Sequence, residues 1–590
     1  MNQIFAPVPR SLREEEAVHA APQAFALVTA SDSLRRQAEI SAALLGSICS
    51  IRINPESDYR IRVDGDTALS GEQYRLECVE NHARICAGSP EGVSRAFSTL
   101  CQLFLSGRFH ELRIDDGPAL VRRGYMLDIS RDRVPARRTL LYILDALWLL
   151  KVNELQLYVE HTFAFAGHEE IWRDASPLTK DDILWLEDQC EARSIELVPN
   201  LNSLGHFGRW LAHPSYRWLS ECPDGCTLPN GRVMPVGGTT LFPCPETLDF
   251  LASLYDEYLP LFSSKRCNGG MDEPWELGLG RSRAACETLG KHRVYLDHLA
   301  AVARMAEKHG KAFEFWADIV LEKPECVPQL PAGITGMIWG YEKGHPFESH
   351  CAAFEKAGVP FVACPGTTGW NSLCGRWENA RSNIAEAVRA CVAHGGTGLL
   401  LTDWGDNGHH QSLPVTLPPL VLAASLAWNP DEAPNVADAI DSFLARDSAR
   451  LTGRLLTLLA SAAERHFSLR LHNTSPAWKL FFAPAGELAQ ILPTADAAKL
   501  PAFREELAFI AAELDRARPE GLGGTLVRRE IALAVRMTDF GACRALAALG
   551  SPQNSPDSLE SIGIDYEELW LARSQRGGLR ESLARIAAIE

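Results

Sequence analysis

The sequence predicts an α/β fold: a (β/α)8 TIM barrel, preceded by a small α+β domain and followed by a helical domain. Two observations lead to this fold class. From Arg122 onward, short strand-like runs alternate with amphipathic helical stretches, giving eight strand–helix units in roughly 300 residues, which is the rhythm of a parallel barrel. Polar and aromatic residues also cluster where the predicted strands end, and barrel active sites lie at the carboxyl ends of the strands.

The composition excludes several classes of function. The formal charge of 58 − 75 = −17 argues against a nucleic-acid partner. The first ten residues lack a basic start followed by an apolar run, so no export signal is expected. The longest apolar stretch, residues 140–150, contains Asp145 and is too short for a membrane span. We therefore expect a cytoplasmic protein without a membrane partner.

The sixteen cysteines have no regular spacing, which indicates reduced thiols rather than a disulfide framework. Cys222 and Cys226 form a close pair, but no second pair stands at a spacing suited to zinc. We expect neither a metal nor an organic cofactor.

The length of 590 residues predicts more than one domain. The first domain, residues 1–118, mixes strands and helices. Residues 73–79 alternate like a half-buried strand that pairs with residues 83–87 as a hairpin. An amphipathic helix follows, with Ser89 as its N-cap.

The barrel is predicted over residues 119–430. Helices expected between its strands include residues 139–151, 181–193, 295–310 and 379–394. The eight strands are expected at residues 124–128, 154–159, 196–199, 266–271, 312–316, 333–339, 360–363 and 398–404.

The remaining residues, 431–590, show Ala/Leu-rich helical periodicity. Candidate helices are residues 438–459, 501–517 and 525–548. This helical domain is expected to pack on the barrel or on a second subunit, so a homodimer is one hypothesis.

Chemistry-bearing residues follow most of the predicted strands. Because the carboxyl ends of barrel strands meet at one face, these side chains are expected to share a site. In strand order they are Asp128, Glu160, His161, Asn200, Asn202, His206, Asp272, Glu273, Trp316, Asp318, Trp339, Tyr341, Trp404 and Asp406.

The neighbouring acids Asp272 and Glu273 stand between a glycine pair and Pro274. Pro274 disfavours helix at Glu273, so the acids are expected at a strand end, where adjacent side chains point to opposite faces. This suits one carboxylate that handles a proton and another that holds a substrate group. In isolation the same tripeptide is also compatible with an ordinary polar turn.

Tryptophans at or beyond the strand ends favour a carbohydrate ligand, because sugar C–H faces stack on indole while hydroxyls pair with polar groups. Core packing is the alternative for any one of them. The residues are Trp275, Trp316, Trp339, Trp370 and Trp404.

Glycosidic cleavage usually requires two carboxyl groups on opposite sides of the bond. Adjacent residues on one strand suit that arrangement poorly. They fit better a substrate-assisted route, in which a 2-acetamido oxygen of the sugar attacks C1, one acid protonates the leaving group and the other holds the acetamide nitrogen.

Several segments resemble glycoside hydrolase family 20, the β-N-acetylhexosaminidases, over roughly residues 25–430. Residues 123–131 (Arg-Gly-Tyr-Met-Leu-Asp-Ile-Ser-Arg) resemble the family's first barrel strand. Residues 268–273 (Asn-Gly-Gly-Met-Asp-Glu) resemble its Gly-Gly-Asp-Glu signature, with Met271 inserted. Residues 160–165, 168–173 and 202–206 look like the hexosaminidase D branch, and the helix after Ser89 resembles the family's companion domain.

The resemblance implies a role for each catalytic carboxylate. Glu273 would be the general acid and then the base, with a raised pKa. Asp272 would bind the acetamide N–H and stabilise an oxazolinium intermediate. His206, with Glu160 or His161, would form a polar relay beneath Glu273.

The resemblance also implies the residues that bind the sugar. Arg123 would pair with sugar hydroxyls, with a surface salt bridge as its alternative role, and Asp406 would take the 4- and 6-hydroxyls. The family holds the acetamide oxygen with a tyrosine, commonly from strand seven, but residues 364–370 contain none; Tyr341 after strand six is the candidate. The pocket walls would be Trp316, Trp339 and Trp404.

The sequence therefore predicts an exo-acting, retaining β-N-acetylhexosaminidase that removes terminal GlcNAc or GalNAc from a small oligosaccharide or glycoconjugate. Two alternatives remain. One is a metal-dependent hydrolase that uses His161, His206 and Asp272 as ligands. The other is an amino-sugar-binding protein without turnover, because fold alone does not determine activity.

Overall fold

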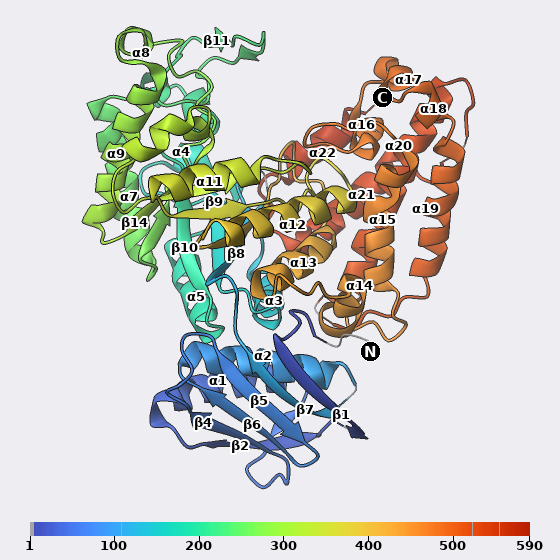
Figure 1. Cartoon of the computed structure of the whole chain (residues 1–590). Helices are drawn as coiled ribbons and strands as arrows, with labels where there is room; N and C mark the ends of the chain where they lie inside the picture. Colours follow the sequence, from blue (N-terminus) through green and yellow to red (C-terminus); the bar gives the residue numbers. More distant parts are fainter. Residues whose placement is uncertain are drawn as a thin grey trace.

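The computed structural model describes residues 5–19, 21–107, 109–131, 133–521, 523–553 and 555–589. It has three regions: a small sheet domain at the amino-terminal end, a central barrel, and a bundle of helices on one flank of the barrel (Figure 1). Among the described residues, no helix combines the length and apolar character needed to cross a bilayer.

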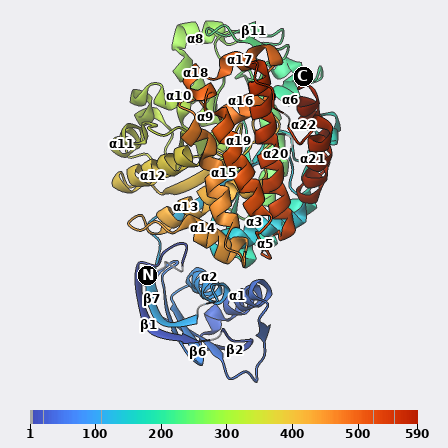
Figure 2. The same ribbon diagram turned by 90° about the vertical axis from the view of Figure 1, so that its right-hand side faces the viewer.

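The first region is a seven-stranded sheet in the order β1-β7-β5-β6-β4-β2-β3. Its two helices, α1 (Asp32–Cys49) and α2 (Pro90–Leu105), lie between this sheet and the barrel (Figure 2). The predicted hairpin is confirmed, and Ser89 Oγ accepts the Gly92 N–H at 3.1 Å as the predicted N-cap. The strands are β1 (Ser11–His19), β2 (Ala24–Thr29), β3 (Arg52–Ile53), β4 (Arg60–Gly65), β5 (Tyr74–Val79), β6 (His82–Ala87) and β7 (Phe109–Asp116).

The central region is a closed barrel of eight parallel strands, as the sequence predicts. Parallel pairing of the last strand with the first closes the ring. The strands are β8 (Arg122–Asp128), β9 (Glu154–Val159), β10 (Glu196–Leu201), β13 (Arg266–Asn268), β14 (Ala312–Trp316), β15 (Thr335–Trp339), β16 (Phe361–Cys364) and β17 (Gly398–Asp403). The main outer helices are α3 (Arg137–Leu149), α5 (Lys180–Ala192), α7 (Pro245–Tyr258), α9 (Lys291–Lys308), α11 (Phe347–Ala357), α12 (Trp377–Ala393) and α13 (Leu417–Trp428).

Strand β13 is three residues shorter than predicted. It ends at Asn268 because the backbone then leaves the extended region: φ is 69° at Gly270 and 79° at Met271. The early end of this strand turns the chain into the barrel mouth just before the two neighbouring acids.

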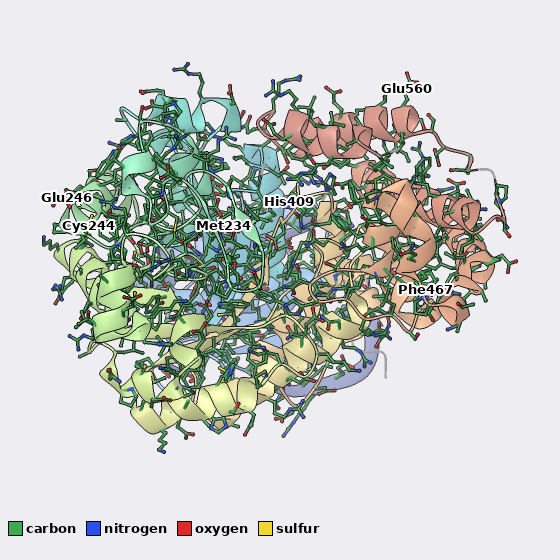
Figure 3. All side chains as sticks on the ribbon, turned by 90° about the horizontal axis from the view of Figure 1, so that it is seen from above. Met234, Cys244, Glu246, His409, Phe467 and Glu560 are labelled. Carbon is green, nitrogen blue, oxygen red and sulfur yellow. The ribbon has the colours of Figure 1, made fainter. Side chains whose placement is uncertain are left out.

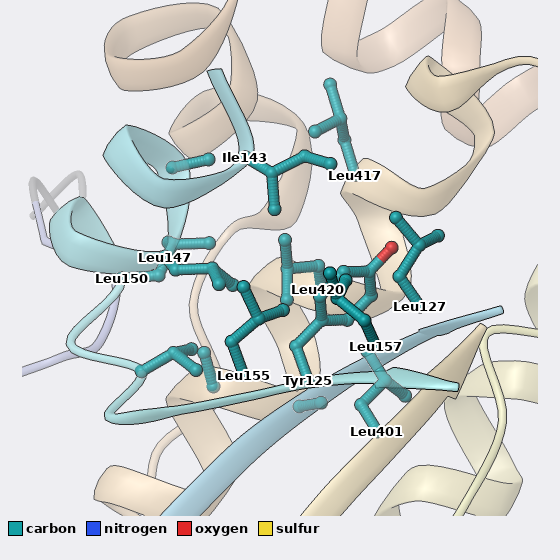
Figure 4. Close-up of a cluster of buried hydrophobic side chains, with 14 of the residues drawn as sticks. Tyr125, Leu127, Ile143, Leu147, Leu150, Leu155, Leu157, Leu401, Leu417 and Leu420 are labelled. Carbon is teal, nitrogen blue, oxygen red and sulfur yellow. The ribbon is translucent and has the colours of Figure 1, made fainter. Parts of the chain in front are cut away.

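The two faces of the barrel strands have different environments. Outward side chains such as Tyr125 and Leu127 pack with Leu155 and Leu157 against α3 and α13 (Figure 4). Inward side chains near the amino ends are charged: Arg122 bonds the buried carboxylates of Glu154 and Glu314. Inward side chains near the carboxyl ends are aromatic instead and form a separate cluster. The alternation along each strand separates inward from outward side chains, and the order of inward residues puts the charged layer at the amino end and the aromatic cluster at the mouth.

The third region contains α14 (Val436–Ala439), α15 (Thr452–His466), α16 (Pro476–Phe482), α19 (Leu500–Leu514), α20 (Thr525–Ala548), α21 (Leu559–Arg573) and α22 (Leu579–Ala587). The predicted helix at 525–548 is confirmed, whereas the single helix predicted at 438–459 is wrong. A π-helical turn over 440–444 ends the first segment. The buried carboxylate of Asp447 then accepts the backbone N–H of Ala449, Leu451 and Thr452, which competes with continued helix.

Candidate active site at the barrel mouth

The two neighbouring acids follow β13 at the carboxyl end of the barrel. This end faces the viewer in Figure 3, where Met234 of the hairpin after β10 and His409 of the loop after β17 are labelled. The Asp272 side chain is 8% exposed and that of Glu273 is 31% exposed. Glu273 has φ 48°, so the chain turns sharply at the acid. One carboxylate is thus buried while its neighbour opens toward the mouth.

Glycines set how closely two loops approach each other here. A Cβ on Gly270 would lie 1.8 Å from Oδ1 of Asn202, and a Cβ on Gly205 would lie 2.1 Å from the carbonyl oxygen of Asp272. The clash at Gly205 is with backbone and could be relieved only by moving the loops apart, and Gly270 has a φ of 69°, which favours glycine. The two glycines therefore allow the loop after β10 to bring His206 against the acids.

His206 contacts three carboxylates. Its Nε2 lies 3.1 Å from Oδ2 of Asp272 and 3.5 Å from Oε2 of Glu273, and its Nδ1 lies 3.7 Å from Oε1 of Glu160. Burial alone would lower the pKa of the imidazole, but Asp272 and Glu160 raise it to about 9. At neutral pH His206 is therefore a cation between the carboxylates, and the structure brings the predicted pair of His206 and Glu160 together.

The environment of Glu273 raises the pKa of its carboxyl group. Burial is the largest cause; the neighbouring Asp272 adds to it, while the His206 cation opposes it. A second buried acid, Asp318, accepts the backbone N–H of Glu273 at 3.2 Å. Its pKa lies well above the usual range because of burial and the charge of Asp272. A raised pKa is what a carboxyl group needs to donate a proton near neutral pH.

The site also contains an arginine that sequence reasoning missed. Arg131 Nη1 lies 3.1 Å from Asp128 and its Nη2 3.3 Å from Glu160, while its Nε lies 3.9 Å from Asp406. The guanidinium is stacked 5.2 Å from the ring of Trp404. Its position three residues beyond the end of β8 was the signal that could have identified it, because residues after a barrel strand face the mouth.

The prediction for Arg123 is wrong. Arg123 lies at the amino end of β8, about 17 Å from Asp128 along a strand that rises about 3.3 Å per residue. Its side chain is buried and donates to Glu72 of the first region at 2.6 Å and to the Leu120 carbonyl at 2.8 Å. Arg123 therefore links the sheet domain to the base of the barrel.

His161 also lies apart from the acids. Because side chains alternate along a strand, Glu160 faces His206 while His161 lines a small separate cavity with Asp174 and Arg209. Burial lowers its pKa to about 3, so the ring is neutral. The alternative metal site of His161, His206 and Asp272 does not assemble, and in the described part of the chain no three His, Cys, Asp or Glu side chains converge in a way that could hold a metal ion.

Aromatic side chains wall the mouth, and the predicted ones lie together. Trp404 Nε1 donates to the Tyr341 hydroxyl at 2.8 Å, and the Tyr341 ring stacks on Trp339 with centroids 5.2 Å apart. Trp316 lies 6.1 Å from Trp404, and Trp370 packs edge-on against Tyr341 at 5.1 Å. The Tyr341 hydroxyl already accepts one hydrogen bond and keeps its own proton to donate.

Two further residues lie at the rim. Asp406, after β17, is 38% exposed at its side chain, and burial raises the pKa of its carboxyl group. The Trp275 side chain is exposed (43%), and the backbone N–H of this residue donates to the Glu273 carbonyl at 2.7 Å. The rim thus carries the Asp406 carboxylate near Arg131 and the Trp275 indole two residues after Glu273.

The mouth of this barrel joins a carboxyl group of raised pKa, a buried carboxylate paired with a histidine, an arginine and an aromatic wall, which are the kinds of group that barrel glycosidases use. The model of glycosyl hydrolase family 20, catalytic domain, matches residues 122–386, and the model of the family's domain 2 matches residues 3–117. The chain belongs to glycosyl hydrolase family 20.

Among curated relatives, the chain is 25% identical over 327 residues to hexosaminidase D of Bos taurus, covering 50% of this chain and 89% of that protein. It is 24% identical over 227 residues to beta-hexosaminidase subunit A1 of Dictyostelium discoideum, covering 36% of this chain. The match spans 41% of that subunit's length.

Solved structures share the fold. The chitobiase of Flavobacterium johnsoniae aligns with a TM-score of 0.61 at 19% identity, over 99% of both chains. An exo beta-N-acetylglucosaminidase of Vibrio harveyi, solved with N-acetylglucosamine, aligns with a TM-score of 0.59 at 16% identity, over 77% of both chains. At such identities the likeness concerns the fold alone.

Proposed function

We propose that this hydrolase is a retaining exo-β-N-acetylhexosaminidase that removes terminal β-linked GlcNAc or GalNAc from small oligosaccharides or glycoconjugates. The observation that supports the proposal is that the two neighbouring acids have different environments. Asp272 is buried and paired with cationic His206, whereas Glu273 is more exposed and has a raised pKa. One acid thus suits the holding of an N–H group and the other suits proton transfer.

In the first step, Glu273 donates its proton to the glycosidic oxygen as the bond from C1 to that oxygen breaks. The carbonyl oxygen of the sugar's own 2-acetamido group attacks C1 from the opposite face and forms an oxazolinium ion. Asp272 accepts the acetamido N–H and balances the positive charge that develops on the ring. The Tyr341 hydroxyl, held by Trp404 at 2.8 Å, donates to the acetamido oxygen and orients it.

In the second step, the Glu273 carboxylate takes a proton from water, and the resulting hydroxide-like oxygen attacks C1. The bond from C1 to the acetamido oxygen breaks, so the acetamido group and the acid return to their starting forms. Two inversions at C1 give net retention. His206, whose pKa is raised to about 9, stays protonated beside both acids throughout.

The remaining site residues would hold the sugar. Arg131 is fixed between Asp128, Glu160 and Asp406, and it is the group suited to the ring hydroxyls. Asp406 would accept from the 4- and 6-hydroxyls, while Trp316, Trp339 and Trp404 would cover the apolar faces of the sugar. This set matches the prediction from sequence, with Arg131 in place of Arg123.

The test is hydrolysis of aryl β-GlcNAc, aryl β-GalNAc and aryl β-glucoside by the wild-type protein, by Glu273→Gln and by Glu287→Gln, an exposed control on the helix that follows. We expect cleavage of the acetamido sugars alone, a loss of about 10²- to 10⁴-fold in Glu273→Gln, and an unchanged rate in the control. Equal cleavage of the glucoside would contradict substrate assistance. Binding of N-acetylglucosamine without hydrolysis would favour a sugar-binding protein.

A further inference from the structure

The C-terminal helices lie beyond both family models, since the domain 2 model ends at residue 117 and the catalytic-domain model at residue 386, yet they contact loops that carry site residues. We call residues 404–411, which follow β17 and include Trp404 and Asp406, the β17 loop. This loop lies between the barrel and α22 (Leu579–Ala587).

Ser582 of α22 bonds the β17 loop at two points. Its Oγ donates to the Gly408 carbonyl at 2.6 Å, and its own carbonyl accepts from Nε2 of His410 at 3.2 Å. Ser582 has no exposed surface, and its Oγ also lies 2.8 Å from the Tyr566 hydroxyl. These buried bonds have no competition from water, so they fix the loop firmly.

The barrel side holds the other end of the same loop. Asp128 accepts the Gly405 N–H at 3.0 Å and also binds Arg131 at 3.1 Å. Asp406 therefore lies between Gly405, which is bonded to the barrel, and Gly408, which is bonded to α22. Because Arg131 and Gly405 share the same carboxylate, the position of Asp406 relative to Arg131 depends on both anchors.

Neighbouring loops repeat this arrangement. Glu342, next to Tyr341, accepts the Asn473 N–H at 2.8 Å and pairs with Arg376 at 2.9 Å. In the loop after β16, the Asn371 carbonyl accepts the N–H of Ser475 at 2.9 Å. Three consecutive strand-end loops thus rest on residues beyond 430.

We propose that Ser582 is a positioning residue for Asp406, so that the C-terminal helices fix the part of the site that binds the sugar hydroxyls. The inference rests on the proposed function for its effect on catalysis. Loss of the Ser582 hydroxyl leaves the buried Gly408 carbonyl without its donor, and the loop relaxes away from Arg131. A misplacement of about 1 Å at such a site lowers the rate by up to about 10²-fold.

The first measurement is hydrogen–deuterium exchange of the full chain in the wild type, Ser582→Ala and Ser461→Ala. Ser461 is a matched control because it is also buried but donates to Thr457 within its own helix. We expect faster exchange of peptides covering 404–411 in Ser582→Ala alone. Unchanged exchange in this loop would overturn the proposal. This readout does not depend on the substrate. It therefore tests whether Ser582 holds the β17 loop even if the proposed activity fails.

The second measurement is a double-mutant cycle of Ser582→Ala and Asp406→Asn on aryl β-GlcNAc. If Ser582 acts through Asp406, Ser582→Ala lowers kcat/KM about tenfold in the wild-type background and has little further effect beside Asp406→Asn. Independent, multiplying losses would overturn the positioning role. Should Ser582→Ala fold poorly, His410→Phe removes the second bond with a ring of similar shape, and the same non-additivity is expected.

Discussion

His206 Nε2 lies 3.1 Å from Oδ2 of Asp272 and 3.5 Å from Oε2 of Glu273, so a buried carboxylate and a partly buried imidazole form an ion pair beside the proposed general acid. The Asp272 carboxylate stabilises the charged form of the imidazole. The ion pair keeps a negative charge where a positively charged oxazolinium ring would form, and it does so before the substrate arrives.

The pH profile of the wild type should report the raised pKa of Glu273. Since the neutral carboxyl is the form that donates the proton, kcat/KM is high below this pKa and falls as pH rises through it. The measurement is kcat/KM for aryl β-GlcNAc against pH in the wild type and in Glu273→Gln. The variant should lose this alkaline decline; an identical decline in both proteins would assign it to another group.

His206→Gln should change how stability depends on pH. The pKa of His206 is raised to about 9 in the folded protein from its ordinary value of 6.5. Its charge therefore stabilises the fold fully below pH 6.5, by on the order of 3 kcal/mol at 1.36 kcal/mol per unit of pKa shift, and this contribution is lost as pH rises through 9. Urea unfolding of wild type and variant should differ most at the acidic end of this window and converge above it.

The control for this experiment is His472→Gln, an exposed position in the C-terminal region. It should track the wild type at every pH. A gap between wild type and His206→Gln that widens toward alkaline pH would contradict the assigned ion pair.

Arg123, in the first barrel strand, and Arg131, in the loop after it, should separate activity from stability. Arg131→Lys loses the planar fork that meets Asp128 and Glu160, and we expect a loss of about 10²-fold in kcat/KM with a nearly unchanged melting temperature. Arg123→Lys loses the bonds to Glu72 and to backbone carbonyls, and it should lower the free energy of unfolding by about 1–3 kcal/mol. The kcat/KM per folded molecule of Arg123→Lys should equal that of the wild type. A loss of activity in Arg123→Lys without a loss of stability would instead place Arg123 in the site.

Trp275 should affect the leaving group rather than the terminal sugar. Its exposed indole follows Glu273, the proposed general acid, by two residues, so we expect it to contact the leaving group. In Trp275→Ala we expect kcat/KM for a GlcNAc disaccharide to fall about tenfold through lost stacking, with little change for the methyl glycoside. Trp218→Ala, at another exposed tryptophan, serves as the control, and equal losses on both substrates would argue against a leaving-group role.

Strand–helix alternation was sufficient to predict the barrel, because each strand had its own apolar run and each crossover its own amphipathic helix. The acids, the aromatic wall and His206 could be predicted because they follow strand ends. Arg123 was assigned to the site although it lies at the start of its strand, far from the carboxyl end where barrel site residues lie. Arg131 follows the carboxyl end of the same strand.

Other features depended on tertiary contacts that a linear pattern does not contain. The break before Thr452 arises from one buried carboxylate, Asp447, that binds backbone N–H groups. The contact between Ser582 and Gly408 joins residues 174 positions apart in the sequence. Neither has a local periodicity from which it could be predicted.

Helix α13 is buried along its whole length, from Leu417 to Trp428. It packs against barrel strands on one side and against the C-terminal helices on the other. A chain cut at the nominal end of the barrel would expose this apolar helix to water, and the lost burial would favour aggregation. The barrel and the C-terminal helices should therefore melt as one cooperative unit, and the catalytic half is not a portable module.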